Sequence, residues 1–253
     1  MKGIWVLNIR RRKPLIFICV AAMFVASWLF IAKEHVSVFS TSEGPQAFYR
    51  ANDAKQSIAL TFNISWGEKR VAPIVKLLQD HDVEHATFFL LASWAEKYPD
   101  LVEVIQEAGY QIGSHGYRYK DYTMLDDEEV IRDMRRSKEV LQQLTDTAPT
   151  LLRPPNGAFT KQTLALADEQ SFDVVHWSVN SYDYKNPGTE AIIENTLSHT
   201  QAGDVLLFHA SDSVKQTEQA LPTILTALKK QGYTFVTIHT LMDGSSADSE
   251  IVE

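Results

Sequence analysis

Short runs of aliphatic, aromatic and β-branched residues recur along most of the chain, and stretches with helical spacing separate them. Several runs are apolar on consecutive positions, among them Phe88-Phe89-Leu90-Leu91 and Val205-Leu206-Leu207-Phe208, which is typical of strands buried on both faces of a sheet. The pattern predicts seven strands, at residues 57–63, 85–91, 110–115, 150–153, 173–179, 204–210 and 234–240.

Helical periodicity fills several of the intervals between these runs. Two apolar sets define the buried faces of two helices: Val130, Met134, Leu141 and Leu144, and Leu221, Ile224, Leu225 and Leu228. Pro73 and Pro222 are expected in the first turns of their helices, where a missing N–H costs little. Strands alternating with helices predict an α/β fold whose parallel sheet is open or closed into a barrel. No G-x-G-x-x-G or P-loop follows the first strand, which argues against a nucleotide-binding version.

The first 32 residues differ from the rest in hydropathy and charge. Residues 14–32 (PLIFICVAAMFVASWLFIA) contain no charged side chain and, at about 1.5 Å per helical residue, nearly span a bilayer core. Basic residues 10–13 precede them directly, so the positive-inside rule predicts a cytoplasmic N-terminus and an exported remainder. A cleaved signal peptide is the alternative, but the run is long for one and Phe30-Ile31-Ala32 is a poor cleavage site. We therefore expect an uncleaved signal anchor.

This reading divides the chain into five segments. They are a cytoplasmic basic N-terminus (1–13), a transmembrane anchor (14–32), a stalk (33–54), the folded domain (55–240) and a polar tail (241–253).

Charge and cysteine content follow the same division. Five of the 24 Lys and Arg precede residue 33, whereas all 32 Asp and Glu follow it, so the exported part carries a formal charge of −13. A domain this acidic is expected to repel nucleic acid, and no basic patch with interleaved aromatic residues occurs. The single cysteine, Cys19, lies in the apolar segment, which leaves the exported part without a disulfide or a thiol nucleophile.

Polar and aromatic residues follow five of the predicted strands at their C-terminal ends, the edge where α/β proteins place their chemistry. They are Asn63 to Gly67, Ser114 to Tyr119, Arg153 to Gly157, Asn180 to Tyr184, and His209 to Asp212. Singly, several have structural explanations: His209 fits a core histidine, and Arg153 could pair with a rim carboxylate such as Asp183. Five such segments at one edge predict a site.

These residues resemble the motifs of the polysaccharide deacetylase family, the NodB homology domain of carbohydrate esterase family four. The resemblance covers roughly residues 55–240. Within the family, the chain most resembles the sporulation-associated PdaB-like proteins. The resemblance implies a distorted seven-stranded (β/α) barrel. It also implies a hydrolase of linear amide carbon–nitrogen bonds, which uses Zn²⁺ or another divalent metal to remove acetyl groups from N-acetylated amino-sugar polymers.

The motifs that hold the base and the metal in this family are altered here. The family's T-F-D-D reads Thr61-Phe62-Asn63-Ile64, which puts Asn63 at the base position and Ile64 at a ligand position. The family's second motif is H-[ST]-x-x-H, and its spacing varies by one residue among members. Here His115 matches the first histidine, and Arg118 or Tyr119 occupies the position of the second.

The remaining motifs are better preserved. R-x-P-[YN]-G is intact at residues 153–157, an Asp-Trp pair becomes Asp183-Tyr184, and a leucine-rich run ends at His209. The resemblance implies that His209 protonates the leaving nitrogen and that an Arg153–Asp183 pair tunes the opposite face. The candidate substrate contacts are Asn156, Tyr184 and Trp66.

These changes alter the expected chemistry. An amide at position 63 cannot take a proton and Ile64 has no lone pair, so His115 is the one surviving ligand and no bound metal is expected. Tyr119, Asp121 and Asp183 are the nearby candidates for a rebuilt ligand set.

Two hypotheses follow. In the first, a membrane-held protein with a degenerate site binds cell-wall glycan, with peptidoglycan in spore formation as the expected setting. In the second, the protein is an active cell-wall deacetylase that uses a non-standard metal set or metal-free chemistry. No protein partner is predicted.

The apolar segment generates a prediction about topology. In a bacterial cell, residues 34–253 should be accessible to protease from outside the cytoplasmic membrane, while the intact protein sediments with the membrane fraction. Protease treatment of spheroplasts followed by immunoblotting tests both points. A shortened, freely soluble exported form would show that the anchor is cleaved.

Overall fold

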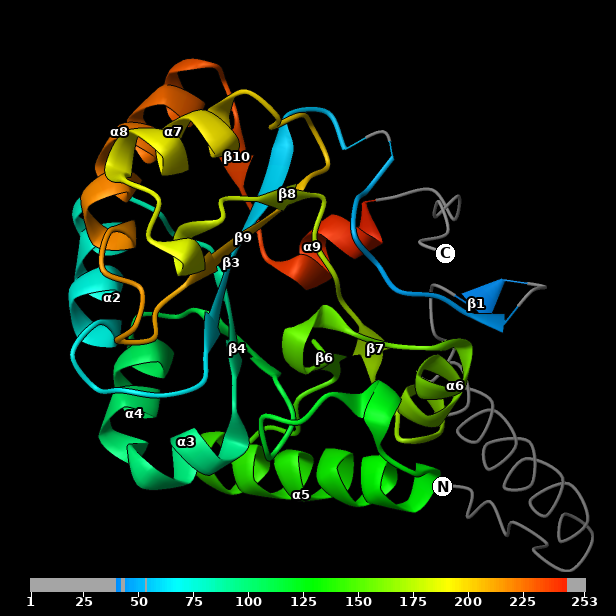
Figure 1. Cartoon of the computed structure of the whole chain (residues 1–253). Helices are drawn as coiled ribbons and strands as arrows, with labels where there is room; N and C mark the ends of the chain where they lie inside the picture. Colours follow the sequence, from blue (N-terminus) through cyan, green and yellow to red (C-terminus); the bar gives the residue numbers. More distant parts are fainter. Residues whose placement is uncertain (1–39, 42–43, 53, 245–253) are drawn as a thin grey trace, which may run out of the picture. The chain divides into compact units, whose positions relative to one another are not determined.

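A parallel sheet organises the domain in this computed structural model, which describes residues 40–41, 44–52 and 54–244 (Figure 1). Seven strands follow the order β7-β6-β5-β4-β3-β9-β8, and β10 pairs with the start of β3. Their bounds are β3 Ser57–Ile64, β4 Thr87–Leu90, β5 Gln111–Ser114, β6 Leu151–Leu152, β7 Asp173–Val174, β8 Val179–Asn180, β9 Val205–His209 and β10 Thr234–Phe235. A separate antiparallel pair joins β1 Ser40–Thr41 to β2 Gly44–Pro45.

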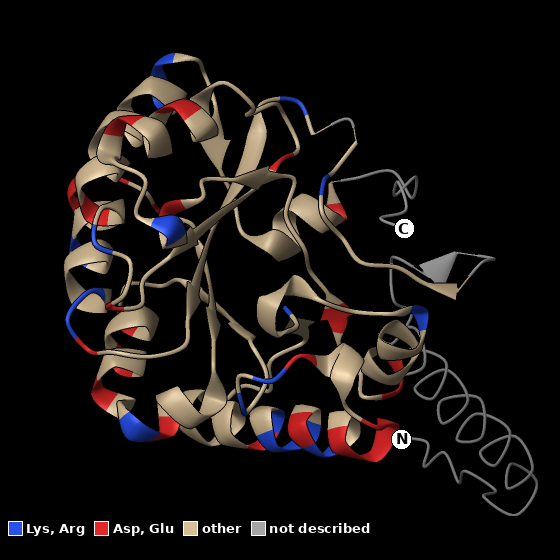
Figure 2. Ribbon diagram, in the orientation of Figure 1, with Lys and Arg blue, Asp and Glu red and all other residues tan. Residues whose placement is uncertain are grey.

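Helices connect the strands and cover the sheet. They are α2 Val71–Asp80, α3 Ala92–Lys97, α4 Pro99–Glu107, α5 Asp127–Thr145, α6 Lys161–Glu169, α7 Thr189–Leu197, α8 Thr217–Lys230 and α9 Ile238–Asp243. Short 3-10 turns occur at η2 Tyr122–Met124, η3 Pro155–Gly157 and η4 Asp183–Lys185. Figure 2 shows Lys, Arg, Asp and Glu gathered on the helices and loops, whereas the central strands carry almost none.

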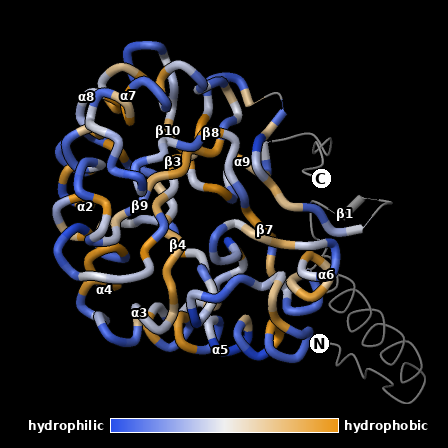
Figure 3. Tube along the Cα trace, viewed as in Figure 1, coloured by the Kyte–Doolittle hydropathy of each residue, from blue (hydrophilic) through white to orange (hydrophobic). Residues whose placement is uncertain are grey.

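The central strand, β3, shows how the sequence builds the core. Its alternate residues Ile58, Leu60, Phe62 and Ile64 are fully buried and pack against α2 and α8 in the main hydrophobic cluster. Ala59, Thr61 and Asn63 point to the other face, which is the concave interior of the sheet. Figure 3 shows the apolar strands as the hydrophobic centre of the domain. Both faces of β3 are packed, so the strand holds Asn63 in a fixed place at its C-terminal end.

The sheet must curve, because its two edge strands are close in sequence. A flat sheet of seven strands would separate β7 from β8 by about 29 Å, at roughly 4.8 Å per strand. Four residues, 175–178, connect the two strands and reach at most about 19 Å. The curved parallel sheet confirms the α/β prediction and is consistent with a distorted (β/α) barrel. Between β7 and β8 no backbone ladder forms in the described part of the chain, so the barrel has a seam.

A segment ahead of β3 lies along this seam. Phe48 is 1% exposed and bridges to Val175 in parallel, and Arg50 bridges to Asp204 on the β9 side. The Arg50 side chain also forms an ion pair with Asp204 at 2.6 Å. These residues fall inside the predicted stalk, yet they pack as part of the domain. Leu241 and Met242 in α9, within the predicted tail, are buried as well.

Several sequence predictions need correction. The run 173–179 forms two short strands, since its middle crosses the seam. The run 234–240 is a strand only to Phe235, because the Thr237 hydroxyl accepts from the N–H of Thr240 and begins α9. Pro222 lies inside α8 rather than in its first turn, because that helix already begins at Thr217. Pro73 does lie in the first turn of α2.

The predicted helix faces are confirmed. Val130, Met134 and Leu141 are buried in α5 and Leu144 is partly buried, and all four apolar residues predicted for α8 are buried. Within residues 40–41, 44–52 and 54–244, no helix is long and apolar enough to cross a bilayer. The predicted anchor at residues 14–32 lies outside those ranges.

Candidate functional site

A cavity of about 650 Å³ opens at the C-terminal ends of the strands. Its wall includes Asn63, Trp66, Asn156, Tyr184 and His209, which the sequence analysis placed at this edge. The structure therefore brings together candidates from β3, β8, β9 and the loop after β6. Three candidates are absent from the wall, since Arg153, His115 and Asp183 are 0%, 1% and 0% exposed and lie behind it.

Arg153 forms the floor below the cavity. Its Nη1 donates to Oδ1 of Asn63 at 3.0 Å and to the hydroxyl of Thr61 at 2.9 Å. Its Nε donates to the carbonyl of Val175 at 3.3 Å, and its Nη2 donates to the carbonyl of His176 at 2.8 Å. Burial lowers the pKa of Arg153 to about 9, so the side chain stays a cation at neutral pH.

The Arg153 bond decides what Asn63 offers to a ligand. With the amide oxygen accepting from the guanidinium, the NH2 group is the end left for the cavity. Asn63 therefore presents a hydrogen-bond donor, suited to an acetyl carbonyl or a sugar hydroxyl. It cannot accept a proton from water.

The neighbouring residue, Ile64, is turned away from the cavity. It is 0% exposed and belongs to the hydrophobic cluster of Leu60 and Phe62, because it follows Asn63 on a strand whose side chains alternate. Position 64 thus offers no ligand atom and is occupied by a core side chain.

His115 is held as a neutral imidazole. Its Nδ1 lies 2.6 Å from the carbonyl oxygen of Arg153, and since a carbonyl can only accept, Nδ1 carries the proton. Burial lowers the pKa of His115 to about 3. The ring keeps one lone pair, on Nε2, and thus one potential ligand atom.

The structure distinguishes the two candidates for the second histidine position. The Tyr119 ring stands edge-on to His115, with centroids 5.6 Å apart, and lines the cavity. Arg118 instead forms an ion pair with Asp133, Nε to Oδ1, at 3.2 Å. Tyr119 therefore occupies the place beside His115. Burial raises the pKa of its phenol, which is protonated at neutral pH.

His209 lines the cavity, and the buried Asp183 holds it from behind. Nδ1 of His209 lies 2.7 Å from Oδ1 of Asp183, and because a carboxylate only accepts, this nitrogen carries the proton. Oδ2 of Asp183 accepts from the His209 backbone N–H at 2.8 Å and from the Thr217 hydroxyl at 2.7 Å. The ring is thereby oriented, with Nε2 as the nitrogen left for a ligand.

The geometry does not support the predicted Arg153–Asp183 pair. Each of the two side chains is fully buried with its own partners, and among the described residues no ion pair joins them. The Arg153 guanidinium is satisfied by side chains of β3 and by the carbonyls of the segment after β7, whereas Asp183 follows β8 and faces its neighbour β9. Asp183 acts on His209 instead.

Exposed aromatic rings surround the opening. Trp66, Tyr119 and Tyr184 line the cavity with 54%, 50% and 45% of their surface exposed. Tyr182, next to Tyr184 at a ring separation of 6.3 Å, is 40% exposed. Large rings exposed together at a concave site favour stacking on a flat apolar ligand face, such as that of a sugar ring.

The sequence analysis missed two supporting contacts, although Ser211 itself lies in the predicted segment His209 to Asp212 and lines the cavity. Ser211 accepts a hydrogen bond from the backbone N–H of Ser65 at 3.0 Å and so ties the β3 and β9 loops together. Thr217 supports Asp183 from α8 across the sequence. Neither belongs to a motif, and no sequence signal marks the contact each makes.

The donor set does not fit a three-ligand metal centre. Within the described ranges there is no group of three His, Cys, Asp or Glu side chains placed to hold an ion. The carboxylates considered as replacements are already engaged: Asp121 caps η2 through the N–H of Thr123, and Asp183 holds His209. One imidazole, that of His115, remains at the position the resemblance assigns to the metal.

Comparison with known proteins agrees with this architecture. The model of the polysaccharide deacetylase family matches residues 50–175. A peptidoglycan-N-acetylglucosamine deacetylase of Bacillus cereus is 33% identical over 193 residues, covering 76% of this chain and 70% of that protein. The uncharacterized protein YlxY of Bacillus subtilis is 30% identical over 207 residues; the match covers 82% of this chain but 64% of YlxY, a little under two thirds of its length.

Solved structures show the same fold. A CE4 family pseudoenzyme from Bacillus anthracis superposes with a TM-score of 0.75 and 28% identity, covering 81% of this chain and 72% of that one. A mutant of that protein, with restored enzymatic activity, gives a TM-score of 0.75 over 80% of this chain and 73% of its own, also at 28% identity. The fold, the preserved motifs and these relatives together place the chain in the polysaccharide deacetylase family.

Proposed function

We propose that this protein binds the N-acetylated amino-sugar polymer of the cell wall, with peptidoglycan as the polymer, and lacks efficient metal-dependent deacetylation. The observation that carries the proposal is the state of the two residues at the end of β3. Asn63 is bound to Arg153 through its oxygen, and Ile64 is part of the core. The base and one ligand are therefore replaced by a hydrogen-bond donor and an apolar side chain.

The cavity retains features that suit glycan binding. Three exposed rings surround it, and its floor carries the Asn63 amide, which can donate to an acetyl carbonyl. Loss of both the base and the metal removes two devices that each typically contribute about a hundredfold or more in rate. Binding survives these losses because it depends on shape and stacking.

Setting and location are part of the same proposal. We infer that residues 14–32 hold the domain at the outer face of the cytoplasmic membrane, where it meets the wall. The support is the uncharged span and the basic residues before it. A role in spore formation is supported by the resemblance to PdaB-like proteins.

A second candidate function has one specific observation in its favour. The Thr217–Asp183–His209 chain of hydrogen bonds is intact and directs one ring nitrogen of His209 toward the cavity. A group oriented in this way could protonate a leaving amine. The alternative is thus an amide hydrolase that generates its nucleophile without Asn63 and Ile64.

The binding proposal predicts the effect of removing aromatic rings. Trp66→Ala and Tyr184→Ala should each weaken binding of the full-length chain in detergent to purified peptidoglycan by about fivefold or more, since a buried stacking ring is worth about 1 kcal/mol. Met124→Ala is the control, because Met124 is 81% exposed and does not line the cavity. Sedimentation with insoluble peptidoglycan measures all three. Parent-like binding by both ring variants would contradict the proposal.

The Asn63–Arg153 contact predicts a gain in stability from one substitution. Asn63→Asp would place a carboxylate beside the buried guanidinium and should raise the free energy of unfolding by about 1–2 kcal/mol at pH 7. The pKa of the new carboxyl should lie below its unfolded value of about 3.9, so the gain is present above that value and disappears as pH falls through the folded-state pKa.

Urea unfolding at pH 7 and pH 3 measures this gain. Asn156→Asp is the matched control, because Asn156 lines the same cavity but is exposed. An unfolding midpoint for Asn63→Asp at or below that of the parent at pH 7 would show that the guanidinium does not reach the new carboxylate.

Restoring all the lost groups should restore metal chemistry. The triple substitution Asn63→Asp, Ile64→Asp, Tyr119→His returns a base and an imidazole beside His115. It also returns a carboxylate at position 64, which must turn out of the core to reach a bound ion. It should bind Zn²⁺ or Co²⁺ near one equivalent and release acetate from N-acetylglucosamine oligomers, whereas the parent holds well under one equivalent and releases none above background. The restored mutant of the Bacillus anthracis pseudoenzyme supports the design.

The buried site of Ile64 supplies a second readout. A carboxylate in that core position should lower the melting temperature of the metal-free triple variant, and bound metal should recover it. Adding His115→Ala to the triple variant is the control and should abolish metal binding. Acetate release by the unmodified parent would overturn the proposed function and favour the hydrolase alternative.

A further inference from the structure

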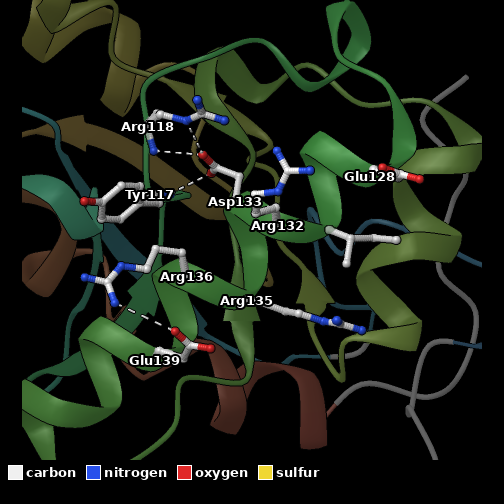
Figure 4. A pocket seen from close by; sticks show the side chains of 9 residues that line it. Tyr117, Arg118, Glu128, Arg132, Asp133, Arg135, Arg136 and Glu139 are labelled. Atoms are coloured by element: carbon white, nitrogen blue, oxygen red, sulfur yellow. Dashed lines mark hydrogen bonds and ion pairs between the residues drawn. The ribbon is translucent and has the colours of Figure 1, made fainter.

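A second hollow, of about 750 Å³, lies along α5 and is rich in arginine (Figure 4). We call it the arginine groove and define it by Arg118, Arg132, Arg135 and Arg136, with Glu128 and Glu139 also in its wall. Three of them, Arg132, Arg135 and Arg136, lie within about one turn of α5. The exported part of the chain is strongly acidic, so this grouping runs against its general charge.

Two of the four arginines are already paired with carboxylates. Nη2 of Arg136 lies 2.6 Å from Glu96, and its Nη1 lies 3.8 Å from Glu139. Arg118 shares Asp133, whose carboxylate is buried and also accepts from two backbone N–H groups and the Tyr122 hydroxyl. Asp133 is therefore fully occupied.

Among the residues that the structure describes, the other two arginines form no ion pair with a carboxylate. Nε of Arg135 donates to the side-chain amide oxygen of Gln170 at 2.8 Å. No ion pair within 4.0 Å joins Arg132 to any carboxylate in the described ranges, although Glu128 lies one helical turn before it. In Figure 4 the Arg132 guanidinium points into the groove on the side of Arg118.

The spacing sets like charges against each other on one helix face. Arg132 is three residues before Arg135 and four before Arg136, and Glu128 and Glu139 at the two ends of this group offset part of the repulsion. An anion held between the guanidinium groups would relieve that repulsion. Guanidinium groups bind carboxylates through paired hydrogen bonds, so a carboxylate is the ligand that fits.

The groove adjoins the glycan cavity. Tyr117 and Arg118 line the groove, and the next residue, Tyr119, lines the cavity. Successive Cα atoms are about 3.8 Å apart, so a single loop forms a wall of both hollows. A peptide of three residues attached to a glycan in the cavity would extend about 10 Å, which is also the most that the three residues 117–119 can span.

We propose that the arginine groove binds the carboxylates of a short acidic peptide carried by the glycan strand in the cavity. The inference rests on the proposed function and specifies its substrate class as peptide-bearing rather than bare glycan. Arg132 and Arg135 supply the free cations, and the buried Asp133 fixes the loop that separates the groove from the cavity.

The test compares three ligands with the full-length chain in detergent: N-acetylglucosamine oligomers, peptidoglycan glycan strands stripped of peptide by an amidase, and the same strands with peptide. The parent should bind the peptide-bearing strands about tenfold more tightly than the stripped ones, as expected for one bidentate carboxylate contact. The preference should shrink as salt rises and vanish when the peptide carboxylates are amidated.

The double variant Arg132→Ala, Arg135→Ala should lose this preference while its affinity for stripped strands stays unchanged. Lys76→Ala, Lys161→Ala removes the same charge from exposed sites outside the groove and should keep the preference. An unchanged preference in the arginine double variant would overturn the inference and leave glycan binding intact. Tighter binding of a phosphodiester polymer than of the peptide-bearing strands would show that the groove binds phosphate groups and not peptide carboxylates. Failure of the parent to bind any strand would refute both this inference and the proposed function.

Discussion

The buried guanidinium of Arg153 is the constraint on which the site depends. It lies inside the curved sheet, donates to Thr61 and Asn63 on β3, and donates to the carbonyls of Val175 and His176 beyond β7. A buried cation is tolerated only when its donors are satisfied, so the backbone on both sides of the interior must keep its place. The carbonyl of Arg153 in turn fixes the His115 ring. One side chain thus positions the floor of the cavity.

The same interaction sets what the end of β3 presents to the cavity. The Asn63 amide accepts from Arg153 and turns its NH2 group toward the cavity. Ile64 meanwhile packs with Leu60 and Phe62 and adds to the core. Both positions are compatible with a stable fold, so the wall around them, including the His209–Asp183 pair, retains its geometry.

The loop after β5 connects two surfaces that would otherwise be separate. Asp133 of α5 is buried and accepts hydrogen bonds from the backbone N–H groups of Tyr117 and Arg118. This holds Tyr119 beside His115 on one side and Arg118 in the groove on the other. Residues 117–119 therefore form part of the wall of both hollows.

The sequence by itself determined the parallel α/β fold, the helix faces and the edge at which the site lies, because apolar periodicity reports burial of a strand or a helix. Only the tertiary structure decided the pairings. Asp183 contacts His209 because β8 and β9 are neighbours, whereas the buried Arg153 is satisfied by β3 and by the carbonyls after β7. Phe48 closes the seam because the sheet curves. Such contacts join segments far apart in the chain, and local pattern carries no information about which distant residue will face a given side chain.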